Sequence, residues 1–246
     1  MKRTPQLKLD SKNYFRLSNG LLLTAPPEVP FRDMFAEVVN SRCYLPSAEF
    51  RIKPGNIVLD IGANVGLFSI WVASNVPSAR IFAFEAASNN FLALAENVRS
   101  NHFKGISAHH YAVSDGRNKC VTLYHGFHGG IHSIRPEYRN WNSSTGRPRR
   151  TERVRAITLE QIFSRFRIQQ VDFLKLDCEG AEYDILLSAP GGVLSRIRRI
   201  VGEYHDLGAK RHGGVLKEFL TRNGFRTRFS AAGPDMPWGM FVATSR

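Results

Sequence analysis

Short apolar runs alternate with segments that carry apolar residues at helical spacing from residue 57 to the end of the chain. The runs have the length of strands buried on both faces, and several of the helical segments stop at Pro, Gly or Asn. Strands are predicted at 57–61, 81–84, 106–113, 171–176 and 200 to about 203, with a hairpin-like piece at 121–124 and a terminal pair at 225–229 and 240–244. Helices are predicted at 67–76, from a cap at Ser88 to Val98, from Thr158 to about 166, at 182–188 and at 215–222. This alternation indicates an α/β fold with a mostly parallel sheet, one antiparallel terminal strand and flanking helices.

Residues 1–50 have a different pattern. Scattered prolines and short apolar pieces interrupt any sustained periodicity, and one helix is predicted near residues 31–39. We therefore predict an N-terminal extension or cap over residues 1–50 and a single domain over residues 51–246.

The composition is that of a folded chain. Of 246 residues, 43% are hydrophobic, and no stretch approaches the roughly 18 unbroken apolar residues of a membrane span. Cys43, Cys120 and Cys178 form neither a CxxC pair nor an even set, so neither a disulfide framework nor a structural zinc site is indicated. The first ten residues are followed by no apolar signal region. We expect a soluble, cytoplasmic protein, and no oligomeric state follows from the sequence.

The charge balance favours anionic partners. Thirty-four basic and 21 acidic residues give a formal net charge of +13. Two groups of arginines are the densest: Arg147, Arg149, Arg150, Arg153 and Arg155 in one, and Arg196, Arg198 and Arg199 in the other. Each group has two interpretations, a solvated surface or an anion-binding rim beside an active site. Nothing typical of a nucleic-acid-binding module accompanies them, so a nucleic acid is a disfavoured partner.

A carboxylate stands at or beside the end of four predicted strands. These residues are Asp60, Glu85, Asp177 and Glu203. In open α/β sheets the ligand crevice lies beyond the carboxyl ends of the strands. The four acids are therefore predicted to converge on one rim.

The segment after the first strand is predicted to be a ligand-binding turn. Asp60 is followed by Gly62, Asn64 and Gly66, an order that matches neither the GxGxxG dinucleotide fingerprint nor a P-loop. Glu85 comes 19 residues after Gly66 at the end of the next strand, where a carboxylate can accept hydrogen bonds from both hydroxyls of a ribose. A glycine turn with a distal acid indicates an adenosyl ligand without a pyrophosphate.

These residues resemble the first two motifs of class I S-adenosylmethionine-dependent methyltransferases, which have a Rossmann-like sheet. The resemblance implies that Asp60, Gly62, Asn64 and Gly66 serve the methionyl end of the cofactor. It also implies that Glu85 holds the ribose and that Ala112, Val113 and Asp115 lie near the adenine edge.

A second segment makes the resemblance narrower. The sequence from Leu174 to Glu182 places Asp177 and Glu179 around Cys178 at the end of an apolar strand, and Glu203-Tyr204-His205 follows later. With 60–68 and 112–115, these segments resemble the FkbM-type methyltransferase family over about residues 50–225, with Cys178 in place of the usual small aliphatic residue. The resemblance implies O-methylation of a hydroxyl on a small-molecule, sugar or glycan acceptor, which the net charge suggests is anionic.

Two hypotheses describe the chemistry at this second segment. In the first, Asp177 orients or deprotonates the acceptor hydroxyl, Glu179 belongs to the same catalytic set, and His205 assists because a histidine pKa near neutrality suits a general base. In the second, Asp177, Glu203 and His205 hold a divalent metal ion that lowers the pKa of the hydroxyl. A charge pair at a helix N-terminus is the structural alternative for Asp177 and Glu179.

Other readings remain for the chain as a whole. The charge would suit an RNA methyltransferase, although neither an amine-methylating Asn/Asp-Pro-Pro-Tyr/Phe motif nor a Pro-Cys motif is present. A non-catalytic cofactor-binding or RNA-binding subunit is the remaining class. His125, His128 and His132 lie in a Gly-rich segment whose spacing does not favour zinc, and we expect a mobile acceptor-binding lid there.

Overall fold

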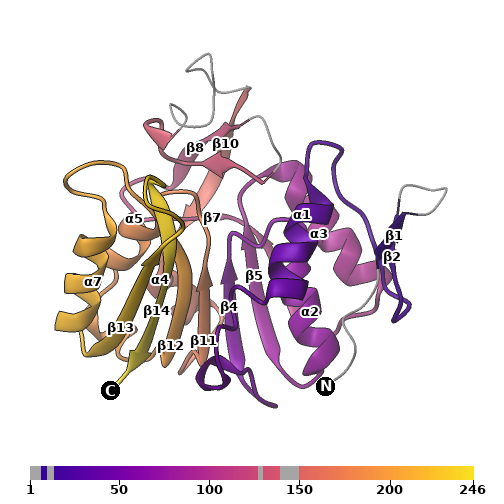
Figure 1. The fold of residues 1–246 in the computed structure, drawn as a ribbon, viewed down its shortest axis with the longest axis horizontal. Helices are drawn as coiled ribbons and strands as arrows, with labels where there is room; N and C mark the ends of the chain where they lie inside the picture. The colour runs from indigo at the N-terminus through magenta and orange to yellow at the C-terminus, as the bar shows by residue number, and fades with distance from the viewer. Residues whose placement is uncertain (1–6, 10–13, 127–129, 139–149) are drawn as a thin grey trace.

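A seven-stranded sheet forms the centre of the computed structural model, which describes residues 7–9, 14–126, 130–138 and 150–246 (Figure 1). The strand order is β13-β14-β12-β11-β4-β5-β6. Its strands are β4 (Ile57–Ile61), β5 (Arg80–Glu85), β6 (Ile106–His110), β11 (Phe173–Leu176), β12 (Arg199–His205), β13 (Phe225–Ala231) and β14 (Trp238–Ser245). β14 is antiparallel to both of its neighbours, and the other adjacent pairs are parallel. The predicted fold class is confirmed.

Helices cover both faces of this sheet (Figure 1). They are α1 (Phe31–Phe35), the π-helix η1 (Ala36–Ser41), α2 (Leu67–Asn75) and α3 (Ser88–Ser100) on one face, and α4 (Leu159–Arg165), α5 (Glu182–Leu187), α6 (Gly191–Leu194) and α7 (Gly213–Arg222) on the other. Successive strand residues divide between the two cores, because side chains alternate across a strand. Val58 and Phe173 belong to the first core, and Leu59 and Leu174 to the second.

The N-terminal segment packs into the first core. It contains β1 (Leu7–Leu9), β2 (Phe15–Leu17), β3 (Leu22–Leu23), α1, η1 and the 3-10 turn η2 (Ala48–Phe50). Leu23, Phe35 and Phe50 are buried in the same cluster as residues of α2 and β4. The helix predicted near 31–39 is confirmed as α1 with η1, and the domain boundary at residue 50 stays a prediction.

A second sheet lies beyond the carboxyl ends of the central strands (Figure 1). It comprises β7 (Ala112–Val113), β10 (Arg150–Ile157), β8 (Cys120–His125) and β9 (His132–Ser133), in that order. The single strand predicted at 106–113 is therefore wrong. The chain changes sheets at Tyr111, so that β6 pairs with β5 whereas β7 pairs with β10.

Helix capping supports one local prediction and corrects another. Thr158 accepts a hydrogen bond from the Gln161 amide at 3.1 Å, and the Gln161 side chain accepts from the Thr158 amide at 3.0 Å, so the predicted capping box is present. Ser88 is not the cap of α3: the cap position is Ala87, and the Ser88 amide donates to Glu152 at 3.0 Å instead.

The two arginine groups have different surroundings. Arg150, Arg153 and Arg155 lie on strand β10 and not in a loop, while Arg147 and Arg149 fall outside the described residues. The group at 196–199 lies at the beginning of β12, at the opposite end of that strand from His205. There Arg198 pairs with Asp172 at 3.0 Å, so this group ties the fold together and does not form a rim at the carboxyl ends. Within the described residues, no helix has both the length and the apolar character needed to cross a membrane.

Candidate functional site

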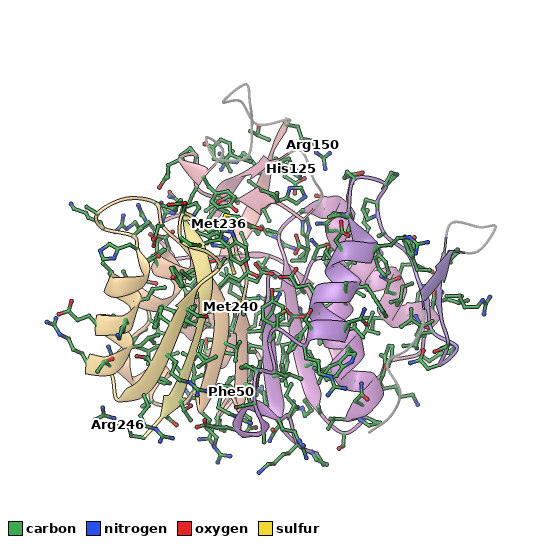
Figure 2. The ribbon with its side chains drawn as sticks, in the orientation of Figure 1. Phe50, His125, Arg150, Met236, Met240 and Arg246 are labelled. Carbon is green, nitrogen blue, oxygen red and sulfur yellow. The ribbon has the colours of Figure 1, made fainter. Side chains whose placement is uncertain are left out.

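The carboxyl ends of four central strands border a cavity of about 710 Å³. Its wall includes a residue at or just after the end of β4, β5 and β11 and two near the end of β12: Gly62, Glu85, Asp177, Glu203 and His205. The turn between β13 and β14 also contributes through Met236, which Figure 2 shows at the same end of the molecule as His125 of the small sheet. Three of the four strand-end acids therefore line one cavity.

Gly62 allows the ends of β4 and β11 to touch. Its φ is +76°, and a Cβ atom there would lie 1.7 Å from the carbonyl oxygen of Asp177. The amides of Gly62 and Ala63 both donate to the Phe84 carbonyl, at 3.0 and 2.9 Å, which fixes the turn against β5. Only glycine fits this position, because any side chain would collide with backbone.

Asp60 and Gly66 support the turn through buried contacts and do not line the cavity. Asp60 is fully buried, accepts from the Ser69 hydroxyl at 2.6 Å and lies 3.2 Å from Nζ of Lys175. Lys175 Nζ also donates to the Gly62 carbonyl at 2.7 Å. Burial alone would lower the pKa of Lys175, but Asp60 and Asp177 outweigh it and raise that pKa. Gly66 has φ +88° at the start of α2, where a Cβ would lie 2.5 Å from Leu94.

Glu85 is a buried carboxylate whose oxygens are oriented by backbone amides. Oε2 accepts from the Asn64 amide at 2.8 Å and Oε1 from the Ala87 amide at 2.7 Å. Burial raises the pKa of Glu85 to about 7, against the lowering effect of these two bonds. Each carboxylate oxygen has a second acceptor position, so Glu85 can still receive two donors from a ligand in the cavity.

The predicted adenine edge is only partly brought to the cavity. Ala112 and Val113 line it beside Phe84. Asp115 does not: it lines a separate cavity and pairs with Arg117 at 3.3 Å. The change of sheet at Tyr111 explains this, because β7 turns away along β10 after Val113.

Asp177 and Glu203 share one donor, the hydroxyl of Tyr44. Tyr44 Oη donates to Asp177 Oδ2 at 2.8 Å and to Glu203 Oε1 at 3.2 Å. Burial, followed by the charges of Asp177 and Glu203, raises the pKa of Tyr44, so this hydroxyl keeps its proton. Burial and the charges of Asp177 and Glu179 raise the pKa of Glu203 well above its ordinary value. Lys175 Nζ lies 3.6 Å from Asp177 Oδ2, so Asp177 contacts both the lysine and the Tyr44 hydroxyl.

His205 is surrounded by carboxylates. Nε2 lies 3.4 Å from Glu179 and 3.8 Å from Glu203, and Nδ1 lies 3.4 Å from Glu182. Burial would lower the pKa of His205, but these charges, that of Glu182 first, raise it to about 10. A raised pKa favours the imidazolium, which has no free lone pair, and the role of His205 as a general base stays a prediction. Glu179 has a left-handed φ of +52°, and its carboxylate accepts a hydrogen bond from the Tyr138 hydroxyl and lies 3.4 Å from His205. Glu179 therefore has partners beyond the charge pair at a helix N-terminus that was its structural alternative.

The arrangement does not support the metal hypothesis for Asp177, Glu203 and His205. Among the described residues, no group of three His, Cys, Asp or Glu side chains is placed to hold a metal ion. The two ring nitrogens of His205 lie 3.4 Å from Glu179 and Glu182, and Asp177 is turned toward Tyr44.

The Gly-rich segment is described only in part. His125 and His132 lie on β8 and β9 with ring centroids 4.4 Å apart, and His132 lines the main cavity. His128 and residues 139–149 fall outside the described residues, so the lid stays a prediction.

Several groups that complete the site were not predicted from the sequence. Tyr44 and Glu37 come from the N-terminal segment and Lys175 from within β11, and Tyr138 and Trp238 also line the cavity. Lys175 had a readable signal, since a lysine inside an apolar strand must be paired when buried. Tyr44 and Glu37 had none, because their segment has no motif and only the folded chain carries them to the cavity.

Comparison with known proteins agrees with this geometry. A sequence model for the methyltransferase FkbM domain matches residues 60–227. The AMB antimetabolite synthetase AmbE of Pseudomonas aeruginosa is 28% identical across 80% of this chain and 10% of that protein. The 31-O-demethyl-FK506 methyltransferase FkbM of Streptomyces tacrolimicus is 27% identical across 78% of this chain and 81% of that protein. This chain therefore spans a tenth of AmbE and about four fifths of the Streptomyces enzyme.

The fold is shared with a solved structure. The crystal structure of methyltransferase FkbM from Methylobacillus flagellatus superposes with a TM-score of 0.54 at 15% identity, over 83% of this chain and 47% of that chain.

Proposed function

This chain belongs to the FkbM methyltransferase family, and we propose that it transfers a methyl group from S-adenosylmethionine to a hydroxyl oxygen of a small-molecule, sugar or glycan acceptor. The observation that carries the proposal is the cavity itself. The same cavity is lined by Glu85, which can accept hydrogen bonds from ribose hydroxyls, and by the acidic residues around Asp177, which we call the reaction end. The Streptomyces relative is named for a methyl group at an oxygen, which supports the O-methyl class.

The residues present fit the cofactor. Glu85 has two free acceptor positions for ribose hydroxyls, and Ala112 and Val113 offer an apolar edge for the adenine. Gly62, Ala63 and Asn64 line the cavity, so this turn can receive the methionyl end. When bound, S-adenosylmethionine supplies an electrophilic methyl group. Asp60 and Lys175 act indirectly, as positioning residues that hold the turn.

In this proposal Asp177 accepts the proton that the hydroxyl of the methyl acceptor loses. Methyl transfer needs the acceptor oxygen in line with the methyl group, and the oxygen loses its proton in the process. Tyr44 and Lys175 hold Asp177 in one orientation, in which its carboxylate can accept the proton of the hydroxyl. Glu203, whose pKa is raised, can instead donate a hydrogen bond to another acceptor oxygen.

The charge of the cavity bears on the acceptor. Glu37, Asp177, Glu179 and Glu203 line the reaction end, against Lys175 and His205 as cations. These carboxyl groups can accept hydrogen bonds from hydroxyls or, where protonated, donate them, so we propose a neutral hydroxyl compound and do not retain the anionic acceptor expected from the net charge. The aromatic rings of Tyr138 and Trp238 suit the apolar face of such an acceptor.

Methyl-label tracing tests this proposal. The protein is incubated with methyl-labelled S-adenosylmethionine and a cell extract separated into small-molecule, glycan, RNA and protein fractions. The expected result is ether-linked label in the small-molecule or glycan fraction. Label in RNA would overturn the acceptor class, and failure to bind S-adenosylmethionine in calorimetry would overturn the function.

A further inference from the structure

A second cavity of about 700 Å³ lies beside α2, and Leu67 lines both this cavity and the catalytic one. Its wall comes from β2–β3, η1, α2 and the turn before β6. The apolar part of that wall is Leu17, Leu21, Leu23, Phe35, Val39, Leu67, Ile70, Trp71, Ala73 and Phe103. A volume of this size is within the range of small-molecule sites, which are mostly apolar with a few polar groups.

The charges of this cavity all have one sign. Arg42 and Lys104 line it, and neither Asp nor Glu is among its described lining residues. Arg42 is half-buried, follows η1 with φ 55°, and holds its guanidinium 5.8 Å from the centre of the Trp71 ring. Within the described part of the chain, no carboxylate forms a salt bridge with Arg42 or Lys104. An apolar wall with cationic groups and no compensating acid matches a ligand that has an apolar body and an anionic end.

We propose that this cavity binds a small amphiphilic carboxylate of the fatty-acid type. The hydrocarbon chain lies against the wall of α2 and η1, and the carboxylate meets Arg42, with Lys104 adding to the positive potential. Charge complementarity selects this ligand over a neutral lipid or a cationic amphiphile, both of which would leave the guanidinium without an anionic partner.

The site is placed to influence the catalytic cavity, because one helical segment separates the two. Met34, Glu37 and Val38 line the catalytic cavity, whereas Phe35 and Val39 line the second one. Residues 36–41 form a π-helix, a rare conformation that often marks functional sites. A ligand that packs against Phe35 and Val39 therefore acts on the segment that carries Glu37 and leads into Tyr44.

Calorimetry on the full chain tests the binding, with decanoate as the probe. One saturable site is expected, and decyltrimethylammonium, which has the same chain and the opposite charge, should not bind it. Arg42→Gln should weaken decanoate binding by about tenfold, since a charge-assisted hydrogen bond is lost. Arg222→Gln, which removes an exposed charge on α7, is the matched control and should leave the affinity within about twofold.

A blocking variant keeps the test decisive. Ser74→Phe adds a ring on the α2 side of the cavity, and thermal unfolding establishes that the variant folds. It should abolish decanoate binding. Equal binding of the two amphiphiles, or decanoate binding unchanged by both Arg42→Gln and Ser74→Phe, would overturn the proposal. Binding that appears only after residues 1–13 are removed would make that segment the occupant and would also overturn it.

The coupling between cavities rests on the proposed function and has its own measurement. Saturating decanoate should change the affinity for S-adenosylhomocysteine by about fivefold to a fixed plateau, as expected for linked sites. If the affinity for S-adenosylhomocysteine instead kept falling as the decanoate concentration rose, the two ligands would be competing for the catalytic cavity, and the second site would be overturned. If decanoate binds but S-adenosylhomocysteine does not, the proposed function fails while the site stands.

Discussion

Gly62 illustrates what the sequence could reveal at the scale of a residue. A glycine just after a buried strand indicated a ligand turn, and the structure gives it a further reason, the 1.7 Å approach of a Cβ to the Asp177 carbonyl. Glu85 and Asp177 were found in the same way, from their spacing behind predicted strands. Asp60 had the same signal but is turned inward, where it accepts from the Ser69 hydroxyl and pairs with Lys175.

Gly62→Ala should damage both the fold and cofactor binding. The positive φ costs about 1–3 kcal/mol for a residue with a Cβ, and the collision with β11 adds to it. Gly55→Ala is a matched control, because Gly55 has φ +78° with no atom within 4 Å of the added Cβ. Denaturant unfolding should show a clearly larger loss of free energy for Gly62→Ala. Equal losses would mean that strand contact does not restrict this position.

His205 should make the folded protein less stable as pH rises. Its folded pKa, raised to about 10, exceeds the ordinary value of 6.5. A group with a raised pKa contributes its full stabilisation below its unfolded pKa and loses it as pH increases through the folded pKa. The free energy of unfolding attributable to His205 should therefore decline between about pH 6.5 and 10.

Unfolding curves at several pH values check this prediction. His205→Gln should remove that decline, whereas His102→Asn, at an exposed histidine with a left-handed φ of 57°, should keep it. The same slope in the wild type and in His205→Gln would contradict the charged state assigned to His205.

At the scale of elements, the long alternating pattern was easier to predict than the short strands. β4, β5 and β11 are mostly apolar and largely buried, so their pattern is easily recognised. β7 has two residues and no period, and β10 carries four charged residues because much of its surface is exposed. The contribution of η1 and Tyr44 to the site comes from packing between distant segments, which local patterns do not encode.

Tyr44→Phe tests that contribution. The ring should still pack at 5.7 Å from Phe68, but Asp177 and Glu203 lose their shared donor. We expect kcat to fall by about tenfold, which corresponds to one hydrogen bond to a charged group, with cofactor affinity kept. The acid limb of the pH–rate profile should move to higher pH, because the ionised form of the pair is less stabilised.

A control separates this effect from general damage to the sheet. Tyr204→Phe alters a tyrosine that packs on Phe229 outside the catalytic cavity, and it should leave the profile in place. A normal profile in Tyr44→Phe would mean that the N-terminal segment only covers the site.

At the scale of the whole molecule, net charge was a poor guide to the site. The chain carries +13, yet the reaction end of the cavity has more acids than bases. The arginines of β10 lie on the small sheet, and those at 196–199 tie strands at the other end. The net charge of the chain does not show where the charges lie. The acids of the cavity come together because β4, β5, β11 and β12 lie side by side in the sheet.

Methyl transfer and cofactor affinity should be compared in the wild type, Asp177→Asn and Asp115→Asn. Asp177→Asn should transfer about 10²- to 10⁴-fold more slowly because the proton acceptor is lost, with the Kd for S-adenosylhomocysteine within about twofold of wild type. Asp115→Asn, the same change outside the cavity, should behave as the wild type. Retained transfer in Asp177→Asn would contradict the account.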